Sequence, residues 1–345
     1  MARVLITGGA GFFGTVLKHR LLDEGFECWS VDLCADPTVR DGFTSTVGDI
    51  ADRSVLDEIF AQTKFDAVFH CAALLAHEVK DKNALWRSNV EGTRVLAECV
   101  RDNGVPKLTF ISSNCLWAEN FRRPVTETDP PRPVEVYGRS KLEGERILLG
   151  FADHFATTVL RSPTIIAPGR LGLLSILFDF IREDRKLWVV GGGHNVYQFI
   201  YAPDLADACL LSYKAEAPGV FNVGSDNVQS IREVYQYVID KAGSKSRIAS
   251  LPKAPTLAAM GLASALHISP LGPYQRRMIA EDFIFDTSKA KAELGWQPTL
   301  SNAEMLYLAY EYYFSNFDEI ATRTDVSAHS RQAKMGVIRL LKWLS

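Results

Sequence analysis

The sequence of 345 residues lacks the features that direct a chain into a membrane, onto nucleic acid or around a metal. No stretch approaches the ~18–20 uninterrupted apolar residues that cross a bilayer, and the first residues lack the long apolar region of a signal peptide. The six cysteines form neither a CxxC pair nor a cysteine–histidine ligand spacing, which fits free thiols in a reducing compartment. Lys and Arg total 38 against 41 for Asp and Glu, so the basic excess of a nucleic-acid binder is missing. We therefore expect a cytoplasmic protein with no metal site and no nucleic-acid partner.

The composition that is present, 47% hydrophobic and 23% charged residues, is typical of a globular chain. Short apolar runs alternate with helical patterns through the first half of the sequence. This alternation predicts an α/β fold with a Rossmann-type, doubly wound parallel sheet. The expected strands are 4–6, 28–31, 67–70, 107–111 and 157–160, and the expected helices are 14–24, 55–62, 83–102 and 140–150.

The second half of the sequence is less regular, which predicts a smaller lobe that interleaves with the sheet. We expect one domain over 1–165, with return segments near 196–224, and a second lobe over 166–316. A strand at 196–201, a helix at 204–213 and a return strand at 221–223 are expected at the join. The apolar stretch 254–266 forms either a helix that closes over a ligand or a buried helix, and the sequence leaves both open.

A glycine-rich turn, Thr7-Gly-Gly-Ala-Gly-Phe-Phe-Gly14, follows the first strand and opens the first helix. Gly8 permits a tight turn, Gly11 lets the backbone approach a pyrophosphate, and Gly14 lets the helix pack closely on the sheet. The helix N-terminus, at Phe12 and Phe13, offers unpaired N–H groups and a partial positive charge to an anion. The turn therefore predicts a dinucleotide site. We accordingly expect 1–165 to be the dinucleotide-binding domain and 166–316 to be mainly the substrate-binding lobe.

Three further segments are expected to line this site, because each lies near the carboxyl end of a strand. Asp32 ends the second strand, where a carboxylate accepts hydrogen bonds from both ribose hydroxyls and repels a 2′-phosphate, which favours NAD over NADP. Asp49 and Ile50 would set a carboxylate and an apolar wall beside the adenine. The small residues of His70-Cys-Ala-Ala73 let the backbone pass close to a cofactor.

Tyr137 and Lys141 are four residues apart, so a helix places both side chains on one face. A lysine ammonium near a phenol favours the phenolate, which makes Tyr137 a plausible base for an alcohol proton and an acid in the reverse direction. Ser112 and Ser113 lie just past a strand, where a hydroxyl could hold the oxygen of a substrate. The pattern predicts proton transfer to and from the hydroxyl of an alcohol.

Together these motifs resemble the extended short-chain dehydrogenase/reductases of the NAD-dependent epimerase/dehydratase family, over about residues 2–316. The resemblance rests on the glycine turn, Asp32, Asp49-Ile50, Asn89-Val-Glu-Gly-Thr93, Ser112-Ser-Asn-Cys-Leu-Trp117, Tyr137 with Lys141, and later landmarks such as Asp204-Leu-Ala-Asp-Ala208 and Leu294-Gly-Trp296. Trp117 stands where the family has tyrosine. Counting back four residues from it identifies Ser113 as the catalytic hydroxyl beside Tyr137 and Lys141.

The resemblance also implies a set of binding residues. The implied NAD contacts are Gly8, Gly11, Phe12, Phe13, Gly14, Asp32, Asp49, Ile50, Ala72, Ala73, Leu74, Asn89, Ser112, Tyr137 and Lys141. The implied substrate contacts are Leu75, Ser113, Asn114, Thr164, Gln198, Arg276 and Arg277. A homodimer formed through helices at 83–102 and 140–150 is a further expectation from the resemblance.

Departures from the family pattern narrow the chemistry. The 4,6-dehydratases carry an acidic pair where this chain has Asn114 and Cys115, so elimination lacks its acid and base. The serine–glutamate arrangement of the decarboxylases is absent as well. Cys115 coincides with a cysteine of the 3,5-epimerase/reductases, but their partner histidine would fall at Gly169, so we interpret Cys115 as a packed thiol. Epimerisation through a rotated ketone, or net oxidation or reduction, remains.

Two groups of residues differ in whether they favour a nucleotide-sugar substrate. Nucleotide-sugar members carry an asparagine and an arginine at the diphosphate, and this chain has Thr164 and Tyr197-Gln-Phe199 there. Arg276 and Arg277 lie about where another diphosphate-binding arginine is expected, and a guanidinium suits phosphate oxygens. Two solvated arginines are the alternative interpretation.

The C-terminal tail, 317–345, ends in a basic amphipathic pattern at 331–345. Such a segment can lie at a membrane interface, here the inner face, or dock on its own body or on a second subunit. We predict an NAD-dependent epimerase of a nucleotide-activated sugar, most simply at C4. The alternatives are an NAD-dependent oxidoreductase of a lipid-linked sugar or sterol-like alcohol, similar to 3β-hydroxysteroid dehydrogenases, and a catalytically silent NAD-sensing protein.

Overall fold

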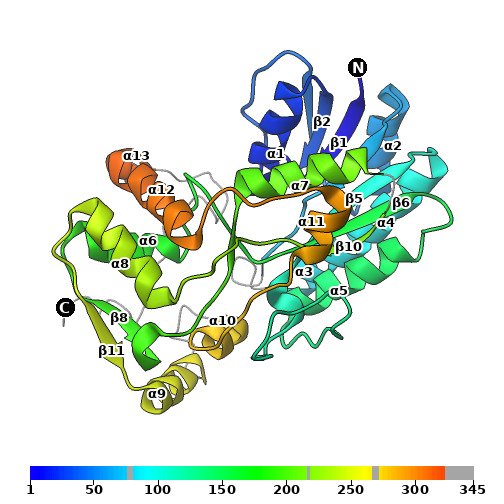
Figure 1. Ribbon diagram of the computed structural model, residues 1–345. Helices are drawn as coiled ribbons and strands as arrows, with labels where there is room; N and C mark the ends of the chain where they lie inside the picture. The colour runs from blue at the N-terminus through cyan, green and yellow to red at the C-terminus, as the bar shows by residue number, and fades with distance from the viewer. Residues whose placement is uncertain (76–80, 216–217, 266–271, 323–345) are drawn as a thin grey trace.

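The computed structural model describes residues 1–75, 81–215, 218–265 and 272–322. Across these residues, a seven-stranded parallel sheet with the order β10-β6-β5-β4-β1-β2-β3 forms the centre of the larger lobe (Figure 1). Its strands are β1 (Arg3–Thr7), β2 (Glu27–Asp32), β3 (Phe43–Val47), β4 (Ala67–His70), β5 (Lys107–Ser113), β6 (Ala156–Ser162) and β10 (Gly219–Asn222). The predicted Rossmann-type fold is confirmed.

Helices cover both faces of this sheet, because its central strands are apolar on both sides. One face is covered by α1 (Phe12–Asp23) and α7 (Ala202–Lys214), with α11 (Ser288–Leu294) packed beside α7. The other face is covered by α2 (Arg53–Gln62), α4 (Gly92–Asp102) and α5 (Val136–Leu149). The strand order reverses between β1 and β4, and ligands of such folds bind at the carboxyl ends of the strands on either side of that point.

Several element limits differ from the sequence prediction. The helix predicted at 83–102 is divided into α3 (Lys82–Trp86), a π-helical turn (Arg87–Glu91) and α4. The edge strand β3 was not predicted, because its alternating Thr-Ser-Thr residues carry little apolar signal. The helix predicted at 140–150 begins earlier, at Val136, so Tyr137 lies in its first turn.

The chain returns to the sheet after entering the second lobe. As predicted for 221–223, β10 pairs in parallel with β6, with Phe221 opposite Leu160. The strand predicted at 196–201 is shorter, since only β9 (Phe199–Tyr201) pairs as a strand, with β7 (Thr164–Ile166). The lobe limits at residues 165 and 316 stay a proposal.

The smaller lobe has its own apolar core. Its elements are α6 (Leu174–Arg182), β8 (Leu187–Val190), α8 (Ile231–Ala242), β11 (Ile248–Leu251), α12 (Asn302–Ser315) and α13 (Phe317–Thr322). Ser230 and Ser301 cap α8 and α12, each in a capping box with a glutamate three residues later. These caps start the helices at defined residues and so position the lobe's core.

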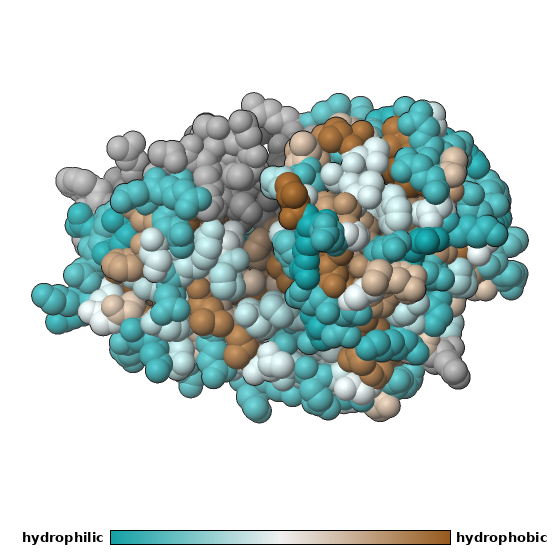
Figure 2. Space-filling view, turned by 90° about the horizontal axis from the view of Figure 1, so that it is seen from above, coloured by the Kyte–Doolittle hydropathy of each residue, from teal (hydrophilic) through white to brown (hydrophobic). Residues whose placement is uncertain are grey.

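A fourth apolar cluster joins the two lobes. It contains Leu116, Trp117, Ala118, Val125, Tyr274, Met278, Phe283 and Phe285. Tyr274 and Met278 belong to α10 (Pro273–Met278) of the smaller lobe, whereas Trp117 follows β5. Seen from above, the surface is hollowed between the lobes and apolar residues lie around this hollow (Figure 2). The carboxyl end of β5 therefore meets α10 directly.

The stretch predicted at 254–266 forms α9 (Lys253–Ala265). Its side chains at 253–263 are exposed or half-buried, with Leu262 64% exposed, so the expectation of a buried helix is wrong for these residues. The tail at 331–345 lies outside the described residues. No helix within the described ranges is long and apolar enough to span a bilayer.

Candidate cofactor and catalytic site

The glycine turn forms a tight cradle between β1 and α1. Gly8 has a φ of +73°, and a Cβ added to it would lie 2.7 Å from the backbone nitrogen of Ala72. A Cβ added to Gly14 would lie 2.0 Å from the carbonyl oxygen of Gly8. Side chains are therefore excluded at both positions, and no side chain caps the N-terminus of α1. This cradle fits the pyrophosphate of a dinucleotide.

Asp32 closes one side of the cradle. One carboxylate oxygen accepts a hydrogen bond from the backbone N–H of Ala10 at 3.0 Å, and the other accepts one from Cys34 at 3.1 Å. The side chain is thus fixed at the end of β2 and remains half-buried. A carboxylate in this position can accept the hydroxyls of an adenosine ribose, and its charge opposes a 2′-phosphate.

The segment after β3 lies beside α4. Asp49 accepts a hydrogen bond from Ala51 N at 2.9 Å and forms an ion pair with Arg87. Ile50 is buried and packs on Gly92, where an added Cβ would lie 2.8 Å from the Ile50 side chain. Gly92 thereby lets α4 approach this segment. The adenine contact expected at Asp49 and Ile50 stays a prediction.

The segment after β4 is held by Asn89, in the π-helical turn. The Asn89 amide oxygen accepts from Leu74 N at 2.7 Å, and its nitrogen donates to Leu74 O at 3.0 Å and to the Ser140 hydroxyl at 3.0 Å. Asn89 is buried, so it binds protein on all these atoms. The expected contacts of Ala72, Ala73 and Leu74 with a cofactor, and of Leu75 with a substrate, remain predictions. The two hydrogen bonds from Asn89 fix the backbone of this segment at Leu74.

The hydroxyl of Ser112 points into the protein. Its hydroxyl donates to Glu145 at 2.5 Å, and Glu145 forms a buried, bidentate ion pair with Arg161, whose nitrogens lie 2.7 and 3.0 Å away. The Ser112 side chain therefore lies in the interior between β5, β6 and α5. The expected contact of Ser112 with a cofactor stays a prediction.

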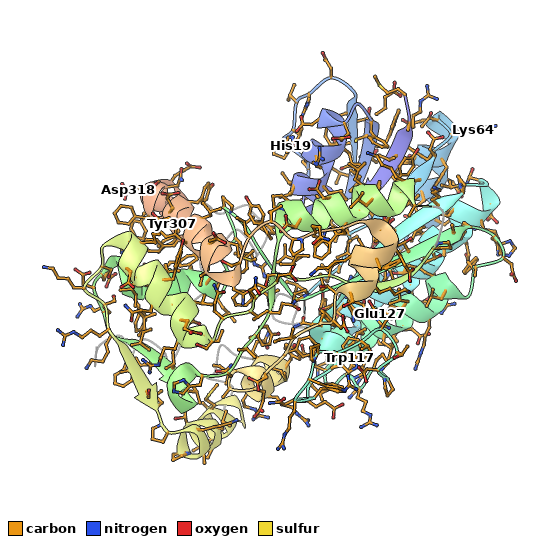
Figure 3. All side chains as sticks on the ribbon, viewed as in Figure 1. His19, Lys64, Trp117, Glu127, Tyr307 and Asp318 are labelled. Carbon is orange, nitrogen blue, oxygen red and sulfur yellow. The ribbon has the colours of Figure 1, made fainter. Side chains whose placement is uncertain are left out.

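Arg161 connects this ion pair to the segment after β5. Its guanidinium lies 5.1 Å from the ring of Trp117 and donates to the carbonyl oxygen of Glu127 at 3.0 Å. Figure 3 shows Trp117 and Glu127 in the region of α5 and α11. Trp117, at the tyrosine position of the family pattern, is fully buried and donates to Pro130 O at 3.1 Å. It therefore has a packing role.

Ser113 ends β5 with its side chain on the face opposite to that of Ser112, as strand alternation requires. Its oxygen accepts a hydrogen bond from the backbone N–H of Cys115 at 3.2 Å. The hydroxyl also makes a long contact of 3.5 Å with the amide oxygen of Asn114. Among the described residues, its proton is therefore available for a bound ligand.

Asn114 is buried against two phenols rather than exposed to a ligand. Its nitrogen donates to Tyr197 at 2.6 Å and to Tyr274 at 3.0 Å, and the two phenol oxygens lie 2.8 Å apart. Burial raises the pKa of both phenols, so they stay protonated at neutral pH. A direct substrate contact at Asn114 stays a prediction, but its amide clearly links β5 to α10.

Tyr137 and Lys141 lie one helical turn apart at the start of α5. Lys141 is buried, and its ammonium donates to the carbonyl oxygen of Ile111 at 2.8 Å. Burial lowers the pKa of Lys141 to about 8. Gly138 allows this close approach, because an added Cβ would lie 2.3 Å from the carbonyl oxygen of Cys115. The helix therefore brings an ammonium against the carboxyl end of β5.

Cys115 has the environment of a packed thiol. Burial raises the pKa of Cys115 to about 12, so its sulfur is protonated at neutral pH. A thiol in that state is a poor nucleophile. This supports the interpretation made from the sequence.

Gln198 differs from its expected role in binding the substrate. It is 1% exposed, its nitrogen donates to Ser225 O at 2.7 Å, and its oxygen accepts from Phe285 N at 2.9 Å. Because Gly224 packs directly on the amide, the side chain is enclosed by protein, and the prediction of a substrate contact is wrong. Thr164 is half-buried in β7 near Tyr197, and its contact with a substrate stays a prediction.

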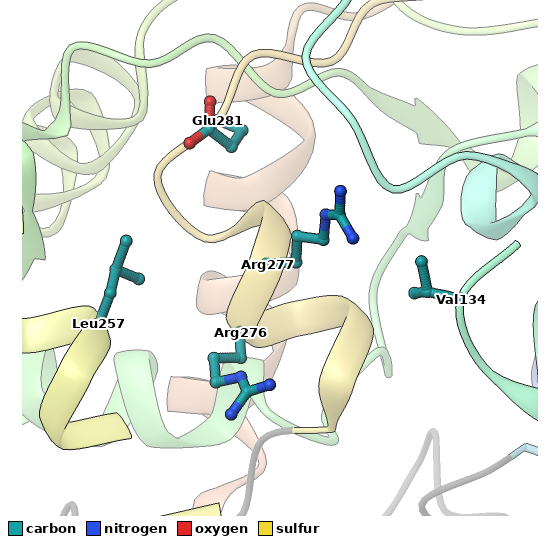
Figure 4. A pocket seen from close by; sticks show the side chains of 5 residues that line it. All are labelled: Val134, Leu257, Arg276, Arg277 and Glu281. Atoms are coloured by element: carbon teal, nitrogen blue, oxygen red, sulfur yellow. The ribbon is translucent and has the colours of Figure 1, made fainter. Parts of the chain in front are cut away.

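Arg276 and Arg277 line a pocket of about 400 Å³ between α10 and α9. Val134, Leu257 and Glu281 complete the lining, and Figure 4 shows Arg277 extending toward the side of Val134. Glu281 is paired with Lys253 at 2.9 Å. Neither arginine has an ion-pair or hydrogen-bond partner among the described residues, so this pocket can accept an anionic group.

Sequence reasoning missed the residues that support the site from a distance in the chain. Glu145 and Tyr274 lie 33 and 160 residues from the side chains they bind, Ser112 and Asn114. Glu135, just before Tyr137, is half-buried and its pKa is raised by burial. Among these residues, only Tyr274 lies close in the sequence to a predicted substrate contact, two residues before Arg276.

Comparison with known proteins gives a consistent picture. Residues 4–224 match the model of the NAD dependent epimerase/dehydratase family. The chain is 35% identical to the uncharacterized protein y4nG of Sinorhizobium fredii, over 98% of this chain and 85% of that protein. It is 30% identical to the UDP-glucose 4-epimerase of Yersinia pestis, over 88% and 94%. The crystal structure of a Thermotoga maritima UDP-glucose 4-epimerase with UDP-glucose has a TM-score of 0.76 at 25% identity, over 91% of this chain and 99% of that one.

Proposed function

Because the chain belongs to the NAD-dependent epimerase/dehydratase family, we propose that it is an NAD-dependent epimerase of a nucleotide-activated sugar, acting most simply at C4. The observation that carries this proposal is the buried ammonium of Lys141, held at the carboxyl end of β5 beside Ser113 and one turn from Tyr137. In the sheet, β5 lies two strands from β1 and its glycine turn. Similarity to the UDP-glucose 4-epimerases supports the substrate class.

The cradle at Gly8 and Gly14 would hold the pyrophosphate of NAD, and Asp32 would accept the hydroxyls of its adenosine ribose. Bound NAD supplies an acceptor for a hydrogen and its electron pair from a carbinol carbon, and the means to return them. Because an epimerase regains its cofactor in every cycle, the protein needs no route for rapid cofactor exchange.

Tyr137 would take the proton of the substrate hydroxyl as the carbinol becomes a ketone, and give it back when the ketone is reduced from its other face. The ammonium of Lys141 stabilises the phenolate by charge. An ammonium has three N–H donors, so its bond to Ile111 O leaves donors for Tyr137 or for a cofactor ribose.

Ser113 would orient the reacting oxygen. Its own oxygen already accepts from Cys115 N, so its hydroxyl proton is directed elsewhere and can be donated to the substrate. This donation would hold the oxygen of the sugar within reach of Tyr137 in both half-reactions.

The diphosphate of the substrate would lie against Arg276 and Arg277. Two guanidinium groups without partners among the described residues, at one pocket, provide the charge. Tyr197 occupies the position of the family's other diphosphate arginine and is hydrogen-bonded to Asn114 and Tyr274. We therefore infer that the arginines of α10 make the main contact with the diphosphate in this chain.

A panel of nucleotide sugars tests the proposal. The purified protein is incubated with UDP-, GDP- and dTDP-linked sugars, and the products are analysed by NMR for inversion at C4. Conversion without net formation of NADH supports the epimerase. The absence of any isomerised product across the panel contradicts it.

The Tyr137→Phe variant tests the assigned acid and base. Removal of a general acid–base group costs ~10²–10⁴-fold in kcat. Tyr237→Phe on α8 is the matched control and should retain activity. An unchanged kcat in Tyr137→Phe would exclude Tyr137 as the acid and base. A protein that only senses NAD would isomerise no sugar and would keep its biological activity in Tyr137→Phe.

A second candidate is an NAD-dependent oxidoreductase of a lipid-linked sugar or a sterol-like alcohol. It is favoured by α9, whose apolar residues at 257–263 are exposed or half-buried beside the arginine pocket. Such an enzyme would form NADH in proportion to the alcohol consumed. The same incubations, extended to a prenyl-diphosphate sugar and a sterol, distinguish the two candidates.

We also propose a homodimer formed through α4 and α5. These helices pack side by side on one face of the sheet, which would let them form one side of a four-helix interface. Light scattering at working concentration measures the mass, and a monomer contradicts the proposal. The proposed contact of 331–345 with a membrane concerns residues outside those described.

A further inference from the structure

A buried histidine at the end of β4 has no part in the proposed mechanism. His70 is fully buried, and both ring nitrogens are bonded to threonine hydroxyls. Its Nδ1 lies 2.7 Å from the hydroxyl of Thr7, and its Nε2 lies 2.8 Å from the hydroxyl of Thr93. The imidazole therefore connects the last residue of β1, just before the glycine turn, to the first turn of α4.

The direction of every proton in this connection is fixed by its Thr93 end. Thr93 donates its proton to the carbonyl oxygen of Asn89 at 2.7 Å, so its oxygen accepts from His70 Nε2. A neutral ring with its proton on Nε2 has a bare Nδ1, so Thr7 donates to Nδ1 while its oxygen also accepts from the backbone N–H of Ala72 at 3.2 Å. The ring is therefore the neutral tautomer with its proton on Nε2, and all its polar atoms are satisfied.

The surroundings of His70 keep it neutral. Burial, with the charge of Lys141 as a second cause, lowers the pKa of His70 to about 3. The ring also lies against Phe110, with centroids 5.2 Å apart. His70 therefore does not titrate in the range where enzymes work, and a role as proton donor or acceptor is excluded for it.

The connection continues to the catalytic helix. The side chain of Asn89, whose carbonyl receives the Thr93 proton, donates to the Ser140 hydroxyl at 3.0 Å. Ser140 in turn donates to the carbonyl oxygen of Tyr137 at 2.8 Å. Asn89 lies in a π-helical turn, a rare conformation that is frequent at functional sites. One hydrogen-bonded path therefore runs from the glycine turn to Tyr137.

We propose that His70 and Thr93 are positioning residues that fix the distance and orientation between the phosphate-binding turn and the helix carrying Tyr137 and Lys141. The inference rests on the proposed function for its kinetic consequences only. A cofactor held by the turn and a base held by α5 must meet at one carbon. A small displacement of one against the other therefore lowers the rate without changing substrate affinity.

A matched pair of variants at Thr93 tests this role. Thr93→Val keeps the shape and removes the hydroxyl, whereas Thr93→Ser keeps the hydroxyl. Because a displacement of about 1 Å can cost ~10²-fold, we expect kcat to fall ~10–100-fold in Thr93→Val with the KM for the sugar within about twofold, and near-normal kcat in Thr93→Ser. Wild-type kcat in Thr93→Val, or an equal loss in Thr93→Ser, overturns the proposal.

The corresponding pair at His70 guards against failure of one variant to fold. A glutamine amide can present an oxygen to Thr7 and an N–H to Thr93, whereas phenylalanine fills the space without either. We expect kcat to be retained at least tenfold better in His70→Gln than in His70→Phe, and NAD affinity, measured by titration calorimetry, to follow the same order. Equal kcat and equal affinity in the two variants overturn the proposal.

A measurement on the wild-type protein does not depend on any substrate. Nitrogen-15 NMR of the imidazole groups, with His70 assigned by the signal lost in His70→Gln, should show the Nε2–H tautomer unchanged from pH 5 to pH 9. Titration in that range, or an Nδ1–H tautomer, overturns the proposal. If no sugar is isomerised but the tautomer and the NAD affinities are as expected, the proposed function fails while the positioning role stands.

Discussion

The ammonium of Lys141 donates a hydrogen bond to the carbonyl oxygen of Ile111 at 2.8 Å, so a buried charge of α5 lies against β5 two residues before Ser113. A helix that starts at Val136 brings this ammonium into the interior, and Gly138 lets its first turn contact the segment after β5. The position of this charge leads to the first prediction.

Activity should depend on pH through Lys141. Burial lowers its pKa to about 8 from an ordinary value of 10.5, so the ammonium that stabilises the phenolate is lost as the pH rises above about 8. We expect kcat to fall over that range, measured in a pH–rate profile of the epimerase reaction. A rate that stays constant to pH 10 contradicts the role assigned to the ammonium.

Lys141 should make the folded state more stable as the pH rises, whereas its effect on kcat is a decrease. Between pH 8 and 10.5 the unfolded chain keeps the proton on Lys141 while the folded chain releases it, so the unfolded state binds more protons. The contribution of Lys141 to the free energy of unfolding therefore rises with pH in this window. Urea titrations of wild type and Lys141→Met at pH 7.5 and 10 measure the difference, and parallel pH dependences would refute the shift.

Gly14→Ala should disrupt the cofactor cradle. The new Cβ would lie 2.0 Å from the carbonyl oxygen of Gly8, so α1 must move away from the turn. We expect loss of NAD binding in titration calorimetry and a lower melting temperature. Gly219→Ala in β10 is the control, because the nearest atom is the flexible end of Lys289 at 3.4 Å, and it should bind NAD normally.

Asp32→Ser should weaken NAD binding and reduce discrimination against NADP. Hydrogen bonds to a charged group contribute about 1.5–3 kcal/mol, so NAD affinity should fall ~10–100-fold, while NADP escapes the repulsion of the carboxylate. Asp41→Ser removes an exposed carboxylate from the chain before β3 and serves as the control for net charge. Equal effects of both variants would show that Asp32 does not touch the ribose.

Glu145→Gln should destabilise the fold strongly. Its partner Arg161 would be left buried with an unpaired charge, which costs about 3–5 kcal/mol in the free energy of unfolding. Glu143→Gln on the same helix breaks only the longer, solvent-exposed contact with Arg146 and should cost about 0–1 kcal/mol. Denaturant unfolding monitored by circular dichroism measures both, and similar losses would contradict the assigned role of the buried pair.

The sequence was sufficient for features whose signal lies in neighbouring residues. The glycine turn with Asp32 predicted the cradle between β1, α1 and β2, and the spacing of Tyr137 and Lys141 predicted their common helical face. The return strand at Phe221 was recognised from its apolar run. In each case a short segment determines both the local backbone and the chemistry it presents.

The sequence was insufficient where a distant partner decides the role of a side chain. Ser112 and Ser113 are adjacent and chemically identical, yet strand alternation sends one to Glu145 and leaves the other at the site. Gln198 was assigned to the substrate because it lies in the segment where nucleotide-sugar members bind the diphosphate, whereas Ser225 and Phe285 enclose it. His70 gave no signal, because its partners Thr7 and Thr93 become neighbours only in the folded sheet.

The return of the chain at β10 affects how such enzymes can be recombined. The strand that completes the sheet beside β6 is encoded beyond the start of the smaller lobe, so the two lobes do not correspond to two continuous stretches of the gene. A chimera that exchanged the smaller lobe at a single junction after Ser162 would take this edge strand from the donor. The residue that the donor supplies at position 221 would then have to pack beside Leu160 of the recipient. Exchange of specificity between relatives therefore requires junctions on both sides of β10, or substitutions made in place.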